Sequence, residues 1–153
     1  MIKKIYIDTS VFGGYFDIEF SRDTIPFFEK LISGQIEIIV SETLELEIYR
    51  APSFIIDLYE SLENIKRVEL TTEVENLALK YINEKVVGKT SLADCHHIAL
   101  ATINNVDVLA SWNFKHIVNL ERIRGYNSIN IREGYKMIEI RTPKEIFDYG
   151  SNN

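Results

Sequence analysis

Three stretches of the sequence hold acidic side chains that could do chemistry. Asp8 follows the apolar residues 5–7 and precedes two hydroxyl residues, Thr9 and Ser10. Asp94 lies in the stretch SLADCHHIALA, and the stretch SETLELE contains three glutamates. Carboxylates gathered in one place repel one another, so a cluster of them makes sense only around a cation. Whether these side chains gather depends on the elements that position them.

Two of the acids have a structural interpretation as well as a functional one. Asp8 lies where an apolar strand ends, a common place for a ligand site, but Asp is also a good helix N-cap. Ser91 and Asp94 have the spacing of a capping box, with Asp in place of the usual Glu or Gln. On a helical projection, however, Asp94 shares a stripe with Ile98 and Ala101 at the border of the apolar face. No Lys or Arg lies three or four residues away to pair with it.

The glutamates of the stretch SETLELE are harder to separate. Leu44 and Ile48 define the buried side of the predicted helix, and Glu47 lies one turn after Leu44, nearer that side than Glu42. Glu45 differs from Glu47 only weakly in this projection. Spacing alone leaves the choice among the three open.

The elements that must position these residues alternate between strand and helix along the chain. Strands are predicted at 2–7, 36–40, 67–70 and 106–111, with two late strands at 129–131 and 137–140. Helices are predicted at 21–34, 41–50, 53–64, 72–85, 91–105, 114–124 and 142–150. This alternation predicts an α/β fold whose parallel sheet is covered on both faces. We expect one domain over residues 1–150 and a short tail at 151–153.

Composition sets limits on the class of protein. The chain has 153 residues and a net charge of −6, which argues against broad, sequence-independent binding of nucleic acid. No apolar run is long enough to span a bilayer and the N-terminus lacks the pattern of a signal peptide, so we expect a cytoplasmic protein without membrane contact. The single Cys95 cannot form a disulfide framework and fits a small buried side chain.

Four stretches occur in the order of the four motifs of PIN domains. They are IYIDTSVF, SETLELE, SLADCHHIALA and VLASWNFKHI, and together they span about residues 2–140. The chain therefore resembles the PIN-domain family of metal-dependent ribonucleases, which includes VapC-type toxins of toxin–antitoxin pairs. The resemblance implies a three-layer α/β/α sandwich with a central, mainly parallel sheet. It also implies an RNA substrate and a cognate antitoxin protein as partners, and a homodimer is common in the family.

The resemblance also implies a site. It selects Asp8, Glu47 and Asp94 as the converging catalytic and metal-binding acids, with Mg²⁺ or Mn²⁺ as the cofactor. These ions take oxygen ligands, polarise a phosphoryl oxygen and lower the pKa of a bound water. Thr9 and Ser10 would orient a carboxylate or hydrogen-bond a phosphate.

The fourth motif departs from the family pattern. The family usually has an Asp where this chain has Asn113, and Ser111 occupies the preceding hydroxyl position. Asn keeps a carbonyl oxygen for the metal but loses a negative charge, and Asp107 is no replacement because it lies at the opposite end of the same strand. Lys115, two residues later, is a candidate phosphate contact. This departure supports an alternative function, a catalytically weak PIN-like module that binds RNA or a protein.

Other chemistry is less well supported. His96 and His97 are adjacent on a helix and point about 100° apart, so they cannot easily share a metal ion. His97 lies one turn beyond Asp94 and could at most lie near the substrate channel. A receiver-type phosphoacceptor needs an Asp at the end of the third strand, and a haloacid-dehalogenase-type phosphatase needs one two residues after Asp8. The sequence has neither, since Ser10 occupies the second position.

Overall fold

A computed structural model describes residues 2–85 and 91–150 of the chain. Five strands form one sheet in these residues: β1 (Lys4–Ile7), β2 (Glu37–Ser41), β3 (Ile65–Val68), β4 (Val108–Ala110) and β5 (Ile140–Arg141). Their order in the sheet is β3-β2-β1-β4-β5, and every neighbouring pair is parallel. The predicted α/β fold with a parallel central sheet is therefore confirmed.

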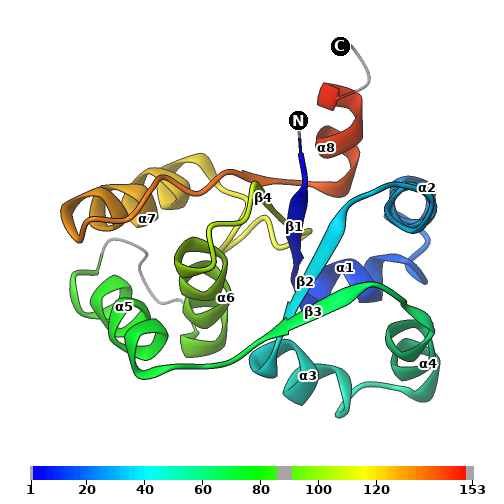
Figure 1. Ribbon diagram of the computed structural model, residues 1–153, viewed down its shortest axis with the longest axis horizontal. Coiled ribbons are helices and arrows are strands. Elements are labelled where there is room, and N and C mark those ends of the chain that lie inside the picture. The colour runs from blue at the N-terminus through cyan, green and yellow to red at the C-terminus, as the bar shows by residue number, and fades with distance from the viewer. Residues whose placement is uncertain (1, 86–90, 151–153) are drawn as a thin grey trace.

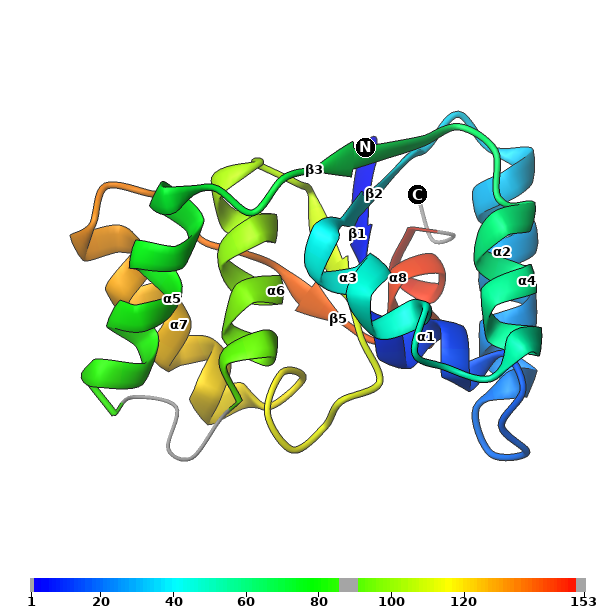
Figure 2. The same ribbon diagram turned by 90° about the horizontal axis from the view of Figure 1, so that it is seen from below.

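Helices cover both faces of this sheet. In chain order they are α1 (Thr9–Gly14), α2 (Ser21–Ser33), α3 (Glu42–Ile48), α4 (Ser53–Ser61), α5 (Thr72–Asn83), α6 (Leu92–Ile103), α7 (Leu120–Arg132) and α8 (Pro143–Gly150). Figures 1 and 2 show α5, α6 and α7 on one side of the sheet and α1, α2, α4 and α8 on the other. The result is the expected three-layer sandwich.

Alternation along the strands builds one core on each face. Tyr6 of β1 packs with α5, α6 and α7, whereas its neighbours Ile5 and Ile7 pack with α1, α2 and α8. The same alternation holds in β2, where Ile39 joins the first core and Ile38 the second. Because successive strand side chains point to opposite faces, a strand buried on both sides is apolar throughout. This is why the strands of this chain read as continuous apolar runs.

The strand order reverses beside β1. β2 and β3 lie on one side of it, while β4 and β5 lie on the other. Asp8 immediately follows β1 and Ser111 immediately follows β4, so both lie at the carboxyl edge where this reversal opens the sheet. Ligands of open α/β sheets collect at such an edge.

The structure corrects the prediction between residues 114 and 132. The stretch at 129–131 was predicted as a strand, but it lies inside helix α7, which begins at Leu120 rather than at residue 114. Asn119 caps this helix, because its side chain accepts a hydrogen bond from the N–H of Arg122 at 3.2 Å. Asn127 and Asn130 are buried in α7 and interrupt the apolar periodicity that would have marked the helix.

The remaining boundaries shift by smaller amounts. β3 ends at Val68 instead of residue 70, and β5 begins only at Ile140, the last residue of the predicted strand 137–140. Cys95 is fully buried, and burial raises the pKa of its thiol to about 12. No helix in the described residues is both long and apolar enough to cross a bilayer. The predicted tail at 151–153 lies outside the described residues.

Candidate metal-binding active site

A cavity of about 320 Å³ brings together side chains from four segments of the chain. They come from the end of β1 with α1, from α3 with the following residues and the start of α4, from α6, and from the loop after β4. The lining residues are Asp8, Thr9, Ser10, Gly13, Glu47, Ala51, Ile55, Asp94, His97 and Asn113. All three acids that the resemblance selected therefore line one cavity.

Asp8 is the most enclosed of the three acids, with only 2% of its surface exposed. It occupies the N-cap position of α1, but its side chain makes no capping hydrogen bond. Instead, Oδ1 accepts a hydrogen bond from Ser10 Oγ at 2.6 Å and Oδ2 accepts one from Ser111 Oγ at 2.5 Å. Burial raises the pKa of Asp8, although the charge of His97 and the two serine hydrogen bonds oppose this shift. The two hydroxyls fix the carboxylate from both sides.

Glu47 reaches the cavity from α3 and is held through one of its oxygens. Oε1 is 2.6 Å from Nε2 of His97 and accepts a hydrogen bond from Thr9 Oγ1 at 3.0 Å. Burial raises the pKa of this carboxyl, but the hydrogen bond and charge of His97 and the bond from Thr9 outweigh it, so the pKa is lowered. The group is therefore held in its ionised form.

The other two glutamates of this helix point to a different partner. Arg67 of β3 forms ion pairs with both Glu42 and Glu45. Glu45 also accepts a hydrogen bond from the hydroxyl of Tyr59 at 2.8 Å. These contacts hold Glu42 and Glu45 outside the lining of the cavity, so Glu47 is the glutamate of this helix that lines it.

The side chains of Asp94 and Asn113 face each other at the N-terminal end of α6. Asp94 lies in the first turn, and its backbone N–H donates to Ser91 Oγ at 3.1 Å, as the capping-box spacing predicted. Its Oδ2 is 3.5 Å from Nδ2 of Asn113, at the limit of a hydrogen bond. Oδ1 of Asn113 accepts the N–H of His116 at 3.0 Å. Asn113 therefore presents a donor to the acidic group while its oxygen closes the turn.

One residue of the cavity, His97, has contacts that the sequence did not predict, and one predicted residue, Lys115, lies outside the cavity lining. His97 is buried in the cavity wall and hydrogen-bonds to Glu47 and to Tyr6 of β1, whereas the sequence had suggested only a place near the substrate channel. The contact with Tyr6 forms because α6 packs beside β1, and no local sequence pattern could indicate this. Lys115 is exposed and is not among the residues that line the cavity, so its role toward phosphate stays a prediction.

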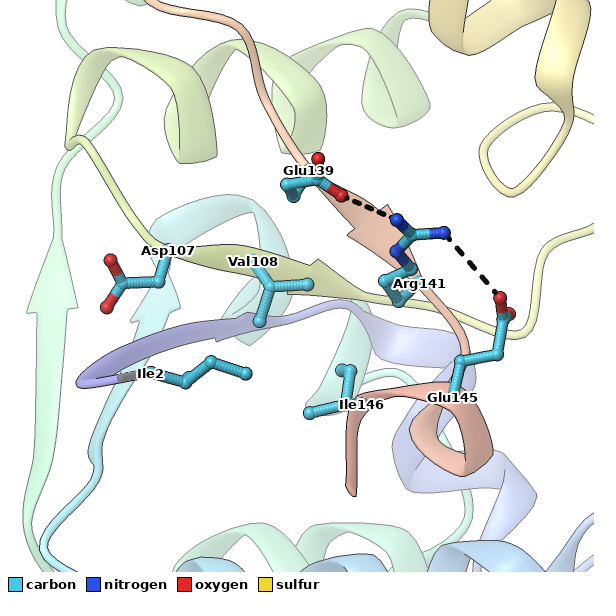
Figure 3. A pocket seen from close by; sticks show the side chains of 7 residues that line it. All are labelled: Ile2, Asp107, Val108, Glu139, Arg141, Glu145 and Ile146. Atoms are coloured by element: carbon cyan, nitrogen blue, oxygen red, sulfur yellow. Dashed lines mark ion pairs between the residues drawn. The ribbon is translucent and has the colours of Figure 1, made fainter. Parts of the chain in front are cut away.

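A second cavity, of about 250 Å³, lies near the opposite ends of the same strands. Figure 3 shows Asp107 and Val108 beside it, with Ile2 and Ile146 below and Arg141 between Glu139 and Glu145. Asp107 is occupied there, because its Oδ2 accepts the backbone N–H groups of Lys3 and Lys4 at 2.7 and 2.8 Å. It cannot supply the charge that Asn113 lacks.

The donor set of the first cavity fits a hard divalent cation. Three carboxylates and two hydroxyls line this cavity, and Mg²⁺ and Mn²⁺ are bound by such oxygen ligands together with water and substrate phosphate. Two hydroxyls hold Asp8 and two donors hold Glu47, the outer support that metal-binding carboxylates usually have. Within residues 2–85 and 91–150, no group of three or more His, Cys, Asp and Glu side chains is placed so that it could hold a metal ion. A divalent cation in the cavity would therefore take fewer than three such side chains as they stand, and water and substrate phosphate would complete its ligand set.

The chain belongs to the PIN-domain family. The family model of the PIN domain matches residues 5–115, which is more than half of the chain and includes Asp8, Glu47, Asp94 and Asn113. Among curated proteins, none matches the sequence.

Solved structures share the fold at low sequence identity. VapC20 of Mycobacterium tuberculosis, a toxin that cleaves the sarcin–ricin loop, is 10% identical with a TM-score of 0.56, over 88% of this chain and 98% of its own. VapBC2 from Rickettsia felis, bound to a fragment of its promoter DNA, is 12% identical with a TM-score of 0.59, over 91% and 98%. FitAcB from Neisseria gonorrhoeae is 13% identical with a TM-score of 0.60, over 91% and 97%. At such identities the likeness concerns the fold alone.

Proposed function

We propose that the protein is an endoribonuclease of the PIN-domain type that depends on Mg²⁺ or Mn²⁺. The observation that supports this most strongly is the single cavity lined by Asp8, Glu47 and Asp94 in a chain of this family. These three acids come from separate elements and line the same cavity, where His97 binds Glu47 and two serines bind Asp8. A divalent cation bound to a phosphodiester would account for three carboxylates in one cavity.

The residues of the cavity divide the work in this proposal. Asp8, Glu47 and Asp94 would hold the ion, which when bound polarises a phosphoryl oxygen and lowers the pKa of a water that attacks phosphorus. Ser10 and Ser111 keep the carboxylate of Asp8 in place. No side chain need act as a nucleophile, because water serves that role.

Cleavage of RNA by variants of Asp94 tests the proposal. Asp94 is half-buried, and its only side-chain contact among the described residues is the weak one to Asn113, so Asp94→Asn should fold normally. We expect the purified protein with Mn²⁺ to cleave a single-stranded RNA and Asp94→Asn to lose at least 100-fold of this rate, roughly the effect of removing a charged group at a transition state. Circular dichroism checks the fold. Cleavage that persists in the variant would come from another nuclease and would contradict the assignment.

A second candidate function is a PIN-like module that binds RNA or a protein without cutting. The geometry of Asn113 favours it, since this residue turns an N–H group toward Asp94 in place of a fourth negative charge. Wild-type protein that binds RNA but cleaves no RNA tested, with Mg²⁺ or Mn²⁺ present, would support this candidate over the first.

The proposed partners follow from the same family. We propose that the protein is the toxin of a toxin–antitoxin pair, a proposal supported by the shared fold of VapC20, which is a toxin. The gene immediately upstream provides the test. Its product should co-purify with this chain and suppress RNA cleavage, and a product that does neither would contradict the toxin assignment. A homodimer stays a prediction.

A further inference from the structure

A buried chain of hydrogen bonds leads from the sheet to Glu47. The hydroxyl of Tyr6 on β1 is 2.7 Å from Ser41 Oγ at the end of β2 and 2.6 Å from Nδ1 of His97 on α6. Nε2 of His97 is 2.6 Å from Oε1 of Glu47. Tyr6, Ser41 and His97 are all buried, so the chain is shielded from water until it reaches the cavity.

The carboxylate at the end of the chain favours one direction for these bonds. Ser41 Oγ accepts the N–H of Leu44 at 3.1 Å as the cap of α3, and its own hydroxyl proton can be donated to Tyr6. In the neutral ring of His97, Tyr6 then donates to Nδ1 and the ring proton lies on Nε2, where it donates to Glu47; in the charged ring Nε2 is a donor as well. The reverse order would point the lone pair of Nε2 at a carboxylate oxygen. Burial raises the pKa of Tyr6, which keeps its hydroxyl protonated as the donor.

We propose that His97 is a positioning residue that holds Glu47 in the orientation needed to bind the divalent cation, with Tyr6 and Ser41 fixing its ring. This inference rests on the proposed function and assigns a role to residues outside the acidic motif positions. His97 acts through Glu47 and does not itself touch the ion or the RNA.

The contacts at Glu47 support this role. His97 is 3% exposed and Glu47 is 39% exposed, so a rigid buried group holds a side chain that faces the cavity. Thr9 and His97 both bind Oε1, and no described residue donates to Oε2. The free Oε2 can therefore face a cation while Oε1 is anchored. A glutamate without this anchor would lose more side-chain freedom on binding the ion.

Affinity for Mn²⁺, measured by titration calorimetry, tests the role without relying on cleavage. His97→Leu keeps most of the volume but removes both ring nitrogens, and we expect it to weaken Mn²⁺ binding about 10–100-fold, the usual effect of losing a group that supports a metal ligand. The matched control is His96→Leu on the same helix, because His96 lies outside the cavity lining. The control should bind Mn²⁺ as the wild type does.

Two further variants separate positioning from loss of structure. His97→Gln retains an N–H donor and should bind Mn²⁺ with an affinity closer to the wild type than to His97→Leu. In the background of Glu47→Gln, adding His97→Leu should cause no further loss, because the anchor has nothing left to position. Equal losses with and without Glu47 would overturn the proposal, as would wild-type affinity in His97→Leu.

The wild-type protein provides a test that does not depend on a variant folding. Nitrogen NMR of the imidazole should show a proton on Nε2 of His97, and a bare Nε2 with the proton on Nδ1 would overturn the proposal. Binding of Mn²⁺ distinguishes failure of the proposed function from failure of the proposed role of His97. A wild type that binds no Mn²⁺ overturns the metal-dependent function together with this role, whereas normal binding that is insensitive to His97→Leu overturns this role alone.

Discussion

Asp8 illustrates how a buried carboxylate can be both costly and useful. Taking its charge out of water disfavours the ionised form, and His97, two serine hydroxyls and the backbone N–H of Val11 offset part of this cost in the metal-free protein. A divalent cation beside the carboxylate would reverse the balance. The site therefore exchanges stability of the metal-free fold for affinity toward a cation, an exchange seen at many functional sites.

Replacing this charge should show the exchange directly. Asp8→Asn is expected to raise the melting temperature in EDTA at neutral pH, where the wild-type side chain is charged when unfolded but penalised when folded. Each kcal/mol gained would raise the melting temperature by about 2–4 °C in a chain of this size. The same variant should lose most of the stabilisation by millimolar Mn²⁺, which acts by binding only the folded state.

Asp107→Asn is the matched control for this change, because Asp107 lies at the opposite edge of the sheet. Its melting temperature in EDTA can fall, since it holds two backbone N–H groups, but its shift on adding Mn²⁺ should equal that of the wild type. Equal Mn²⁺ shifts in wild type and Asp8→Asn would show that Asp8 does not bind the ion.

Restoring the missing charge at Asn113 should have linked effects. In Asn113→Asp one oxygen can still accept the N–H of His116, while the other replaces the amide nitrogen that faces Asp94 at 3.5 Å. We expect Mn²⁺ to bind more tightly by on the order of 1 kcal/mol or more, and the metal-free form to lose stability through repulsion. Calorimetry and melting in EDTA measure the two effects. Unchanged Mn²⁺ affinity with an unchanged metal-free melting temperature would exclude Asn113 from the site.

The sequence predicted the three acids that line the cavity but not the residues that hold them. The residues alone left Asp8 open between a ligand and a helix N-cap, and the resemblance to the family selected it, as it selected Glu47 over Glu45 where helical periodicity could not. His97 was set aside because it and the adjacent His96 point about 100° apart and cannot easily share a metal ion. Its two partners, Tyr6 and Glu47, are separated from it by 91 and 50 residues, so only the assembled fold could reveal them.

At the scale of elements, a close contact between α1 and the loop after β4 supports the site. A Cβ added at Gly14 would lie 2.7 Å from Cδ1 of Trp112 and 3.0 Å from Oγ1 of Thr24. The indole N–H of Trp112 donates to that same Oγ1 at 2.9 Å and its backbone N–H donates to Ser10 Oγ at 2.9 Å. The loop that contains Ser111, Trp112 and Asn113 therefore depends on the absence of a side chain at Gly14.

Alanine substitutions at the two adjacent glycines should act in opposite directions. Gly14→Ala is expected to destabilise the fold by about 1–3 kcal/mol, because Trp112 must move to admit the methyl group. Gly13→Ala adds the same methyl group where nothing lies within 4 Å, and should stabilise the helix by up to about 1 kcal/mol. Denaturant unfolding measures both. A Gly14→Ala variant as stable as Gly13→Ala would contradict the packing at Trp112.

Helix α7 shows where prediction of the elements failed. Its buried face holds Asn127 and Asn130 among apolar residues, so the pattern appeared broken and a strand was predicted at its end. Asn127 binds the backbone of Ile138 through both its amide nitrogen and its oxygen, at 3.1 and 2.7 Å. Asn127 thus holds the backbone that leads into β5, while the amide of Asn130 donates to Asn127 and to Thr102. Tertiary contacts of this kind override local periodicity.

At the scale of the whole molecule, the parallel sheet and the place of the site were predictable together. Strand–helix alternation with apolar strands predicts a sheet covered on both faces, and such a sheet collects ligands at its carboxyl edge. The strand order that opens this edge beside β1 was not predictable, because it depends on which strands pair. Asp8 and Ser111 become neighbours only through the pairing of β1 with β4.

The stability of the whole chain should report the charge state of this edge as pH changes. Burial raises the pKa of Asp8, so its cost to the metal-free fold is present at neutral pH and is relieved as pH falls through the raised pKa. The lowered pKa of Glu47 acts oppositely, because its contribution is present above the ordinary pKa of Glu and is lost as pH falls through the lowered one. Metal binding needs both groups ionised.

We therefore expect the stabilisation by Mn²⁺ to decrease on acidification, and to begin decreasing above the ordinary pKa of Asp, about 4. Protons should compete with Mn²⁺ first at Asp8, because its raised pKa lets this carboxylate take up a proton at a higher pH than the other acids do. Melting temperatures with EDTA and with millimolar Mn²⁺, measured from about pH 7 to about pH 4, should converge as pH falls. In Asp8→Asn the small remaining difference should stay flat until the pH nears the ordinary range of carboxyl groups. A wild-type Mn²⁺ shift that is constant down to about pH 4 would show that no carboxyl with a raised pKa takes part in binding.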